Sequence, residues 1–292
     1  MEWWLIMVIL FGGLILLMLT SAPIAFCFAL FNLIATFFVM GAGGFSQVVL
    51  SVAESLMRFT LLPVPMFVLM GGVIFYSGMA NRVIAVVDEW IGRLPGRLSL
   101  LAVASGTLFA ALTGSTIGSV AMLGTLLVPE MRSRGYSSSM YLGPIMAAGG
   151  LAMIIPPSAL GVILGSLAGI NIGQLLIGGV LPGILIAGMY SLYIILRAAI
   201  QSRAAPSYHV SPKPMSTKVL NFSKYVLPLA FIILAVLGSM FVGVATPTEA
   251  AALGAFAAFI LAAIYKKLNW KVTKDSARTT IEITAMAFMI IA

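Results

Sequence analysis

The chain has 292 residues, of which 61% are hydrophobic and only 8% are charged. Because a soluble domain carries about a quarter charged residues, this composition indicates a polytopic membrane protein. One cysteine, Cys27, and one histidine, His209, argue against disulfides, cysteine-cluster or histidine-rich metal sites and Ser-His or Cys-His catalysis. The excess of basic residues does not indicate nucleic-acid binding, because they cluster in short loops between apolar runs.

Two apolar runs, 3–20 and 22–40, open the chain, and a very tight turn, Thr20–Pro23, joins them. Each run is long enough to cross a bilayer, since a spanning helix needs about 20 residues for a hydrocarbon core of about 30 Å. Residues 45–60 mix polar and apolar side chains and predict an amphipathic helix at the membrane interface. A further span follows at 62–80, opened by two prolines.

A second amphipathic connector is predicted at 81–97, where charged residues lie between apolar ones. The next apolar segment, 98–128, is interrupted by the hydroxyl- and glycine-containing stretch Thr113–Thr116. Its two arms would be about 22 and about 18 Å long, so neither crosses the bilayer alone. We therefore expect a re-entrant helical hairpin that enters and leaves the membrane on one side.

The rest of the chain alternates between spans and polar connectors. We expect a polar loop at 129–140, a span at 141–168 broken by Pro156-Pro157-Ser158, a further span at 174–196 and a basic loop at 197–224. A second tight pair of spans at 225–243 and 249–265, a basic connector at 266–278 and an apolar segment from about Thr279 follow.

The distribution of Lys and Arg indicates the orientation. With the N-terminus outside and a re-entrant hairpin at 98–128, every one of the sixteen Lys and Arg except Arg58 lies on the cytoplasmic side. If this segment crossed the membrane fully, the loops on its two sides would face opposite compartments and the bias would disappear. Because cytoplasmic loops carry the excess of Lys and Arg, the pattern favours the hairpin and a periplasmic N-terminus.

The order of elements indicates an all-α polytopic membrane protein built on an inverted-topology repeat, the usual architecture of secondary transporters. A tight pair of spans, an arm and the start of a further span occur twice, beginning on opposite sides of the membrane. We divide the chain into scaffold spans and interfacial arm at 1–60, a transport-domain half at 61–224 and the start of the second repeat at 225–292. The second series lacks its own hairpin and broken helix, so we expect the 292-residue chain to insert but not to transport alone.

The Pro-Pro-Ser break predicts one half of a binding site. Lipid cannot satisfy freed backbone groups, so a break at mid-span must face protein or a water-filled cavity. The prolines lack N–H donors, which leaves carbonyls around Ile154 and Ile155 without their intrahelical partners. The predicted Na⁺ ligands are Ile155, Pro156, Pro157 and Ser158, and Ser158 is also expected to contact the substrate. The alternative is a Pro-kinked helix in which the Ser158 hydroxyl bonds back to its own backbone.

The hairpin tip predicts the other half of the site. Glycine lets the backbone approach a ligand closely, and hydroxyls with freed carbonyls suit a hard cation such as Na⁺. The N-terminus of the second arm offers N–H groups and a positive dipole end to a carboxylate. We predict Thr113, Gly114 and Ser115 as Na⁺ ligands and Ser115 and Thr116 as substrate contacts, with Ser115 close to Ser158. The alternative is a loop tip packed between helices, because small residues also allow close approach.

Glu249 is the one acidic residue near an outer membrane edge. It could carry a proton. An acid in the first turn of a helix that begins near Thr248 complements the helix dipole, which favours a capping role.

Several motifs resemble the large membrane subunit of tripartite ATP-independent periplasmic (TRAP) transporters. They are Phe109-Ala110-Ala111-Leu112-Thr113-Gly114-Ser115, Val128-Pro129-Glu130-Met131, Gly135-Tyr136, Ile155-Pro156-Pro157-Ser158, Leu181-Pro182-Gly183 and Ala245-Thr246-Pro247-Thr248-Glu249-Ala250-Ala251. Their order is specific, and the resemblance covers essentially the whole chain. The sequence departs from the family pattern where its second repeat is half built.

The resemblance implies an elevator-type, ion-coupled transporter of the bacterial inner membrane, in which a transport domain slides against a fixed scaffold. A soluble periplasmic binding protein would deliver a small organic acid, such as a C4-dicarboxylate or sialic acid. A small four-span membrane subunit would complete the complex, and the Na⁺ gradient would drive uptake. Neither enzymatic activity nor a cofactor beyond the coupling Na⁺ is expected.

Two other functions stay open on the sequence. One is a related two-hairpin anion carrier that works without a binding protein. The other, from a different class, is a channel subunit, although re-entrant hairpins with tips inside the membrane suit occlusion better than a continuous pore. An intramembrane enzyme fits least, because the apolar core contains no His or paired acids.

Overall fold

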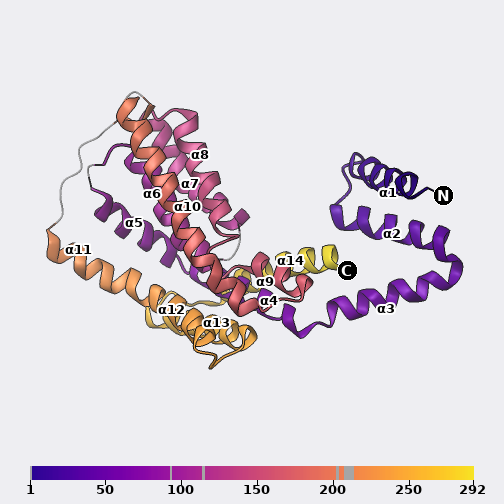
Figure 1. The fold of residues 1–292 in the computed structure, drawn as a ribbon. Coiled ribbons are helices and arrows are strands. Elements are labelled where there is room, and N and C mark those ends of the chain that lie inside the picture. Colours follow the sequence, from indigo (N-terminus) through magenta and orange to yellow (C-terminus); the bar gives the residue numbers. More distant parts are fainter. Residues whose placement is uncertain (1, 93, 114–115, 202–203, 207–213) are drawn as a thin grey trace. The chain divides into compact units, whose positions relative to one another are not determined.

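The computed structural model describes residues 2–92, 94–113, 116–201, 204–206 and 214–292, and all regular structure in these ranges is helical (Figure 1). The all-α class predicted from the order of elements is therefore confirmed. The helices form two compact units, one of Met1–Phe59 with Ile281–Ala292 and the other of Thr60–Thr280.

The first unit contains the two apolar helices that open the chain. They are α1 (Trp3–Met18) and α2 (Ile24–Met40), and the predicted tight turn joins them. A methyl group on Gly13 of α1 would lie 2.6 Å from the Phe31 ring, so glycine lets the two helices pack closely. The predicted arm is helix α3 (Gly44–Leu56), and the unit also includes the end of α14 (Trp270–Ile291).

The second unit contains the hairpin, the broken helix and most of the later helices. Its elements are the 3₁₀ turn Phe59–Leu61, which starts one residue before the unit boundary, α4 (Pro63–Tyr76), α5 (Met79–Ile91), α6 (Arg97–Thr113), α7 (Thr116–Ser133), α8 (Ser138–Leu151), α9 (Ala159–Ala168), α10 (Ile172–Ile200), α11 (Met215–Asn221), α12 (Leu227–Phe241), α13 (Pro247–Ile264) and the first part of α14. In Figure 1, α6, α7, α8 and α10 lie side by side. Helix α13 packs along α4, where a methyl group on Gly254 would lie 2.9 Å from the sulfur of Met70.

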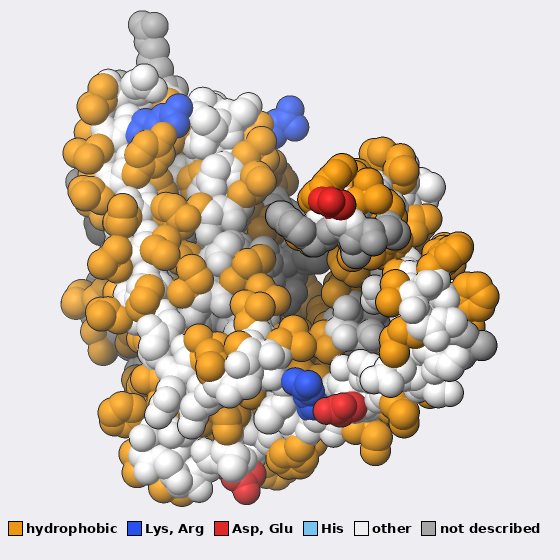
Figure 2. Space-filling view, turned by 45° about the vertical axis from the view of Figure 1, so that its right-hand side comes forward, with side chains coloured by type: hydrophobic (Ala, Val, Ile, Leu, Met, Phe, Trp, Pro, Cys, Tyr) orange, Lys and Arg blue, Asp and Glu red, His pale blue; other side chains and the backbone are white. Residues whose placement is uncertain are grey.

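Four helical stretches among the described residues are long and apolar enough to cross a membrane. They are Phe59–Tyr76, Ile172–Ile200, Met215–Phe241 and Pro247–Ile264. Each overlaps a span predicted from the sequence, whereas α1 and α2 are shorter apolar helices. Figure 2 shows hydrophobic side chains spread over most of the visible face and only scattered charges. Such a surface is typical of a protein whose solvent is lipid.

Three connectors are more helical than expected. Helix α7 continues to Ser133 and α8 begins at Ser138, so the loop predicted at 129–140 shrinks to the turn between them. Helix α11 occupies part of the basic loop predicted at 197–224, and α14 runs through most of the connector predicted at 266–278. Lys, Arg and Glu are good helix formers. The charged residues of these connectors therefore indicate contact with water, and they do not show where a helix ends.

The start of α13 confirms the capping role of Glu249. The Thr246 hydroxyl accepts a hydrogen bond from the Glu249 N–H at 3.3 Å, and the Thr246 N–H donates to the Glu249 carboxylate at 2.8 Å. This reciprocal pair is a capping box, with Pro247 at the first helical position, which satisfies two N–H groups that the helix leaves unbonded.

We expect Thr246→Ala to lower the free energy of unfolding by about 1 kcal/mol, because the cap hydroxyl is lost. Thr246→Ser keeps the hydroxyl and serves as the matched control. Thermal unfolding in detergent measures both, and equal midpoints for the two variants would contradict the role of the cap.

Candidate functional site

The predicted span 141–168 consists of two short helices separated by a buried irregular segment. Helix α8 ends at Leu151 and α9 begins at Ala159, which confirms the break at the Pro-Pro-Ser motif. Pro156, Pro157 and Ser158 are all buried, and the peptide between the two prolines is cis. The break is therefore buried from Ile155 to Ser158, whereas Met153 is 46% exposed.

Ser158 links the two sides of the break. Its hydroxyl donates to the Met153 carbonyl at 2.9 Å and accepts from the Gly161 N–H at 3.1 Å. In a continuous helix the Met153 carbonyl would bond to residue 157, but proline has no N–H, so the hydroxyl takes that place. The second bond makes Ser158 the N-cap of α9. Ser158 thus bonds to nearby backbone, as the alternative of a proline-kinked helix predicts, and its roles toward Na⁺ and substrate stay predictions.

The broken segment packs directly against helix α10. A methyl group on Gly179 would lie 2.4 Å from the Ile154 carbonyl oxygen, and one on Gly183 would lie 2.4 Å from the Ile155 side chain. The glycines let the irregular chain lie directly on the helix. Around this contact, a buried cluster of Leu151, Ala152 and Ile155 packs against Ile186, Ala187, Tyr190 and Ile233.

The hairpin forms as two helical arms, α6 and α7. They contain 17 and 18 residues, which corresponds to about 26 and about 27 Å, longer than predicted but still short of a bilayer core of about 30 Å. Thr113 ends α6 and Thr116 begins α7. Gly114 and Ser115 lie outside the described residues, so their proposed ligand roles and the approach of Ser115 to Ser158 stay predictions.

The start of α7 lies beside the broken helix. A methyl group on Gly149, near the end of α8, would lie 3.4 Å from the Thr116 side chain and 2.2 Å from that of Val120. The Gly149 carbonyl accepts from the Ala152 N–H, the first residue of the break. The start of α7 thus contacts the last turn of α8, the helix that precedes the break.

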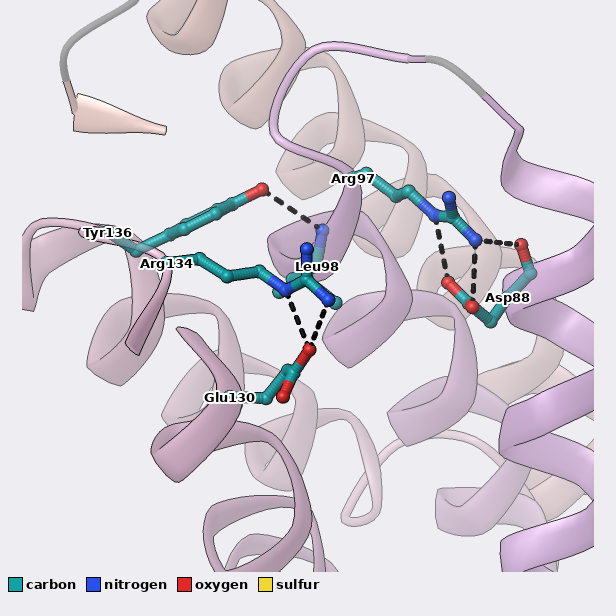
Figure 3. Close-up of polar contacts among 6 residues, drawn as sticks. All are labelled: Asp88, Arg97, Leu98, Glu130, Arg134 and Tyr136. Carbon is teal, nitrogen blue, oxygen red and sulfur yellow. Dashed lines mark hydrogen bonds and ion pairs between the residues drawn. The ribbon is translucent and has the colours of Figure 1, made fainter. Parts of the chain in front are cut away.

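A buried ion pair holds the base of the hairpin (Figure 3). The Arg97 guanidinium lies 2.7 Å from the Asp88 carboxylate and also donates to the Asp88 carbonyl at 3.0 Å. Arg97 is only 5% exposed and is the first residue of α6, where the helix dipole disfavours a cation. Asp88 of α5 compensates for that. The sequence predicted 81–97 only as an amphipathic connector, and an arginine at the edge of an apolar run was the one signal of this pair.

The Gly-Tyr motif supports the same base. Gly135 has a left-handed backbone with φ of +77°, which favours glycine, and the turn places the Tyr136 hydroxyl 3.5 Å from the Leu98 N–H (Figure 3). Leu98 is in the first turn of α6, where N–H groups have no helical partner. Burial raises the pKa of the Tyr136 phenol, and the hydrogen bond from Leu98 partly offsets this rise.

The chemistry available at the break is that of oxygen atoms. Among the described residues, no group of three or more His, Cys, Asp or Glu is placed to hold a metal ion. Backbone carbonyls and the Ser158 hydroxyl remain as the candidate ligands, and oxygen ligands of this kind suit hard cations.

The fold and site define a helical membrane protein in which a helical hairpin lies against a broken helix. The model of one protein family, described as "Tripartite ATP-independent periplasmic transporter, DctM component", matches residues 11–292. The chain therefore belongs to the DctM family of TRAP transporter permeases, as its motifs predicted.

Individual relatives agree with this assignment. The chain is 31% identical over 289 residues to the ectoine TRAP transporter large permease protein TeaC of Halomonas elongata, covering 97% of this chain and 66% of the relative. It is 28% identical to the C4-dicarboxylate TRAP transporter large permease protein DctM of Rhodobacter capsulatus, with the same coverage. It is 32% identical to the isethionate TRAP transporter permease protein DctMQ of Oleidesulfovibrio alaskensis, covering 87% of this chain and 39% of the relative.

We expect Asp88→Asn to lower the free energy of unfolding by about 2 kcal/mol, because it leaves the buried Arg97 charge without this carboxylate. The loss is below that of a fully buried pair because the Asp88 side chain is 33% exposed. Glu130→Gln is the matched control. It breaks the exposed ion pair with Arg134, which spans one helical turn and contributes less than about 0.5 kcal/mol. Equal unfolding midpoints for the two variants in detergent would show that the buried pair does not stabilise the hairpin base.

Proposed function

We propose that this chain is the large permease subunit of a TRAP-type secondary transporter that imports a small organic acid by Na⁺ symport. The observation that carries the proposal is the buried Pro-Pro-Ser break of a helix whose first half, α8, packs against the hairpin. Interrupted helices inside the membrane are the usual sites for substrate and coupling ions. The relatives named for ectoine, C4-dicarboxylate and isethionate support a small solute with an acidic group. The chain spans 66% of the length of TeaC and of DctM, so the activity proposed is that of the whole transporter.

In the proposed site, different groups bind the cation and the anionic substrate. Carbonyls of 154–157 and the Ser158 hydroxyl would bind Na⁺, together with Thr113, Gly114 and Ser115 of the hairpin tip. The N-terminus of α7 at Thr116 would present N–H groups to the carboxylate of the substrate. The contact of Thr116 with Gly149 joins α7 to the helix before the break and supports this arrangement, in which one bound ion would bridge the two halves.

We further propose an elevator movement in which the transport-domain half at 61–224 carries the site across the membrane. A periplasmic binding protein and a small membrane subunit are the proposed partners, the bacterial inner membrane is the proposed location, and the inverted repeat is the proposed basis of the movement.

The orientation of the hairpin is tested by cysteine labelling in a Cys27→Ser background. We expect Leu94→Cys, before α6, and Ser138→Cys, after α7, to react with an impermeant maleimide from the cytoplasmic side, because both ends of a re-entrant hairpin lie on one side. Val244→Cys, between α12 and α13, is the periplasmic control and is 79% exposed. Labelling of positions 94 and 138 from opposite sides would overturn the hairpin.

The coupling is tested by uptake into proteoliposomes that contain the complete transporter and its binding protein. We expect saturable uptake of an organic acid that requires an inward Na⁺ gradient, and we expect Ser158→Ala to raise the Na⁺ concentration for half-maximal uptake by about tenfold, because one ligand is lost. Ser191→Ala is the control, since that hydroxyl donates to the Ala187 carbonyl one turn earlier in α10. Uptake that does not depend on the Na⁺ gradient, or uptake that does not saturate with substrate concentration, would refute the symport proposal.

A further inference from the structure

The contact between α10 and the broken helix involves a backbone oxygen. The Ile154 carbonyl points at the backbone of Gly179, and the nearest atom that a methyl group at position 179 would meet is this oxygen, at 2.4 Å. Any side chain at that position would force the backbone of the break to move, because atoms do not approach so closely. Gly179 therefore determines where the Ile154 carbonyl can lie.

This carbonyl has lost its helical donors. The residue three positions on, Pro157, has no N–H, and Ser158 is extended with φ of −118° and ψ of 119°, so its N–H does not continue the helix. Among the described residues, no backbone N–H donates to the Ile154 oxygen. A contact with a glycine Cα–H is weak, so the lone pairs of this oxygen stay available for a stronger partner.

One turn later in α10, a second glycine makes a similarly close contact, this time with a side chain of the break. A methyl group on Gly183 would lie 2.4 Å from Cγ1 of Ile155, and Ile155 is buried. The contact is specific to this face of α10, because a methyl group on Gly178 or Gly188 would meet no atom within 4 Å. Two successive residues of the break thus lie on two glycines separated by one turn.

We infer that Gly179 is a positioning residue that holds the Ile154 carbonyl in place as a ligand of the coupling cation. Gly183 has a related role, because it lets the Ile155 side chain lie against α10 and so fixes how closely the broken segment approaches that helix. This inference rests on the proposed Na⁺ symport. Neither glycine touches the ion; each acts through the segment that does. It also explains the Leu181-Pro182-Gly183 motif as part of the binding site's support and not only of helix packing.

The test compares adjacent glycines in the complete transporter. Gly179→Ala is expected to raise the Na⁺ concentration for half-maximal uptake by about tenfold or more, as loss of a supporting contact does at other ion sites. Gly178→Ala is expected to leave it at the wild-type value, since the added methyl meets open space. Equal Na⁺ dependence in both variants, with Na⁺-coupled uptake in the wild type, would overturn the inference alone. A wild type without Na⁺-coupled uptake would overturn the proposed function, and the sodium role inferred for Gly179 with it.

A second experiment, which enlarges one side chain and shortens its neighbour, distinguishes a positioning role from a general loss of stability. Gly183→Ala is expected to raise the same half-saturation concentration, and adding Ile155→Ala is expected to restore it, because truncation removes the atoms that the methyl displaces. Gly179→Ala is not expected to respond to Ile154→Ala, because its conflict is with backbone. Rescue of Gly179→Ala by Ile154→Ala, or failure of the rescue at Gly183, would contradict the geometry.

Discussion

A carbonyl or N–H group inside a bilayer has no water to bind, and this constraint shapes the whole of the larger unit. Two prolines remove donors from the middle of an apolar helix, and the surrounding protein must compensate. The Ser158 hydroxyl replaces one missing donor and caps the helix that follows. Helix α10 packs on the break through Gly179 and Gly183, and the prolines and Ser158 are buried. The break persists because the fold encloses it.

Glycine makes that enclosure possible. The close contacts at the break involve Gly149 against α7, Gly106 against Ala148 of α8, and Gly179 and Gly183 against the broken segment itself. In lipid the hydrophobic effect does not drive helices together, so close packing of backbones supplies much of the attraction. Glycines therefore bring the hairpin against α8 and the broken segment against α10.

Two polar contacts join helix α5 to its neighbours. Asp88 neutralises Arg97 at the base of the hairpin, and Glu89 accepts two hydrogen bonds from Asn221 of α11. Both contacts join α5 to helices on either side of it, so this amphipathic helix connects the hairpin with the later part of the chain. The connector is predictable as an amphipathic segment, but its partners are not.

The helical membrane class, the two arms at 98–128, the Pro-Pro-Ser break, the cap at Thr246 and the family could all be predicted from the sequence. These features depend on composition, on residues within one turn of each other, or on motif order. The contacts of Gly149 with Thr116, of Gly179 with Ile154 and of Arg97 with Asp88 were decided by the tertiary structure. Each depends on which face a helix turns to its neighbour and on how the two cross. In a chain that is apolar on nearly every face, hydrophobic periodicity does not reveal that choice.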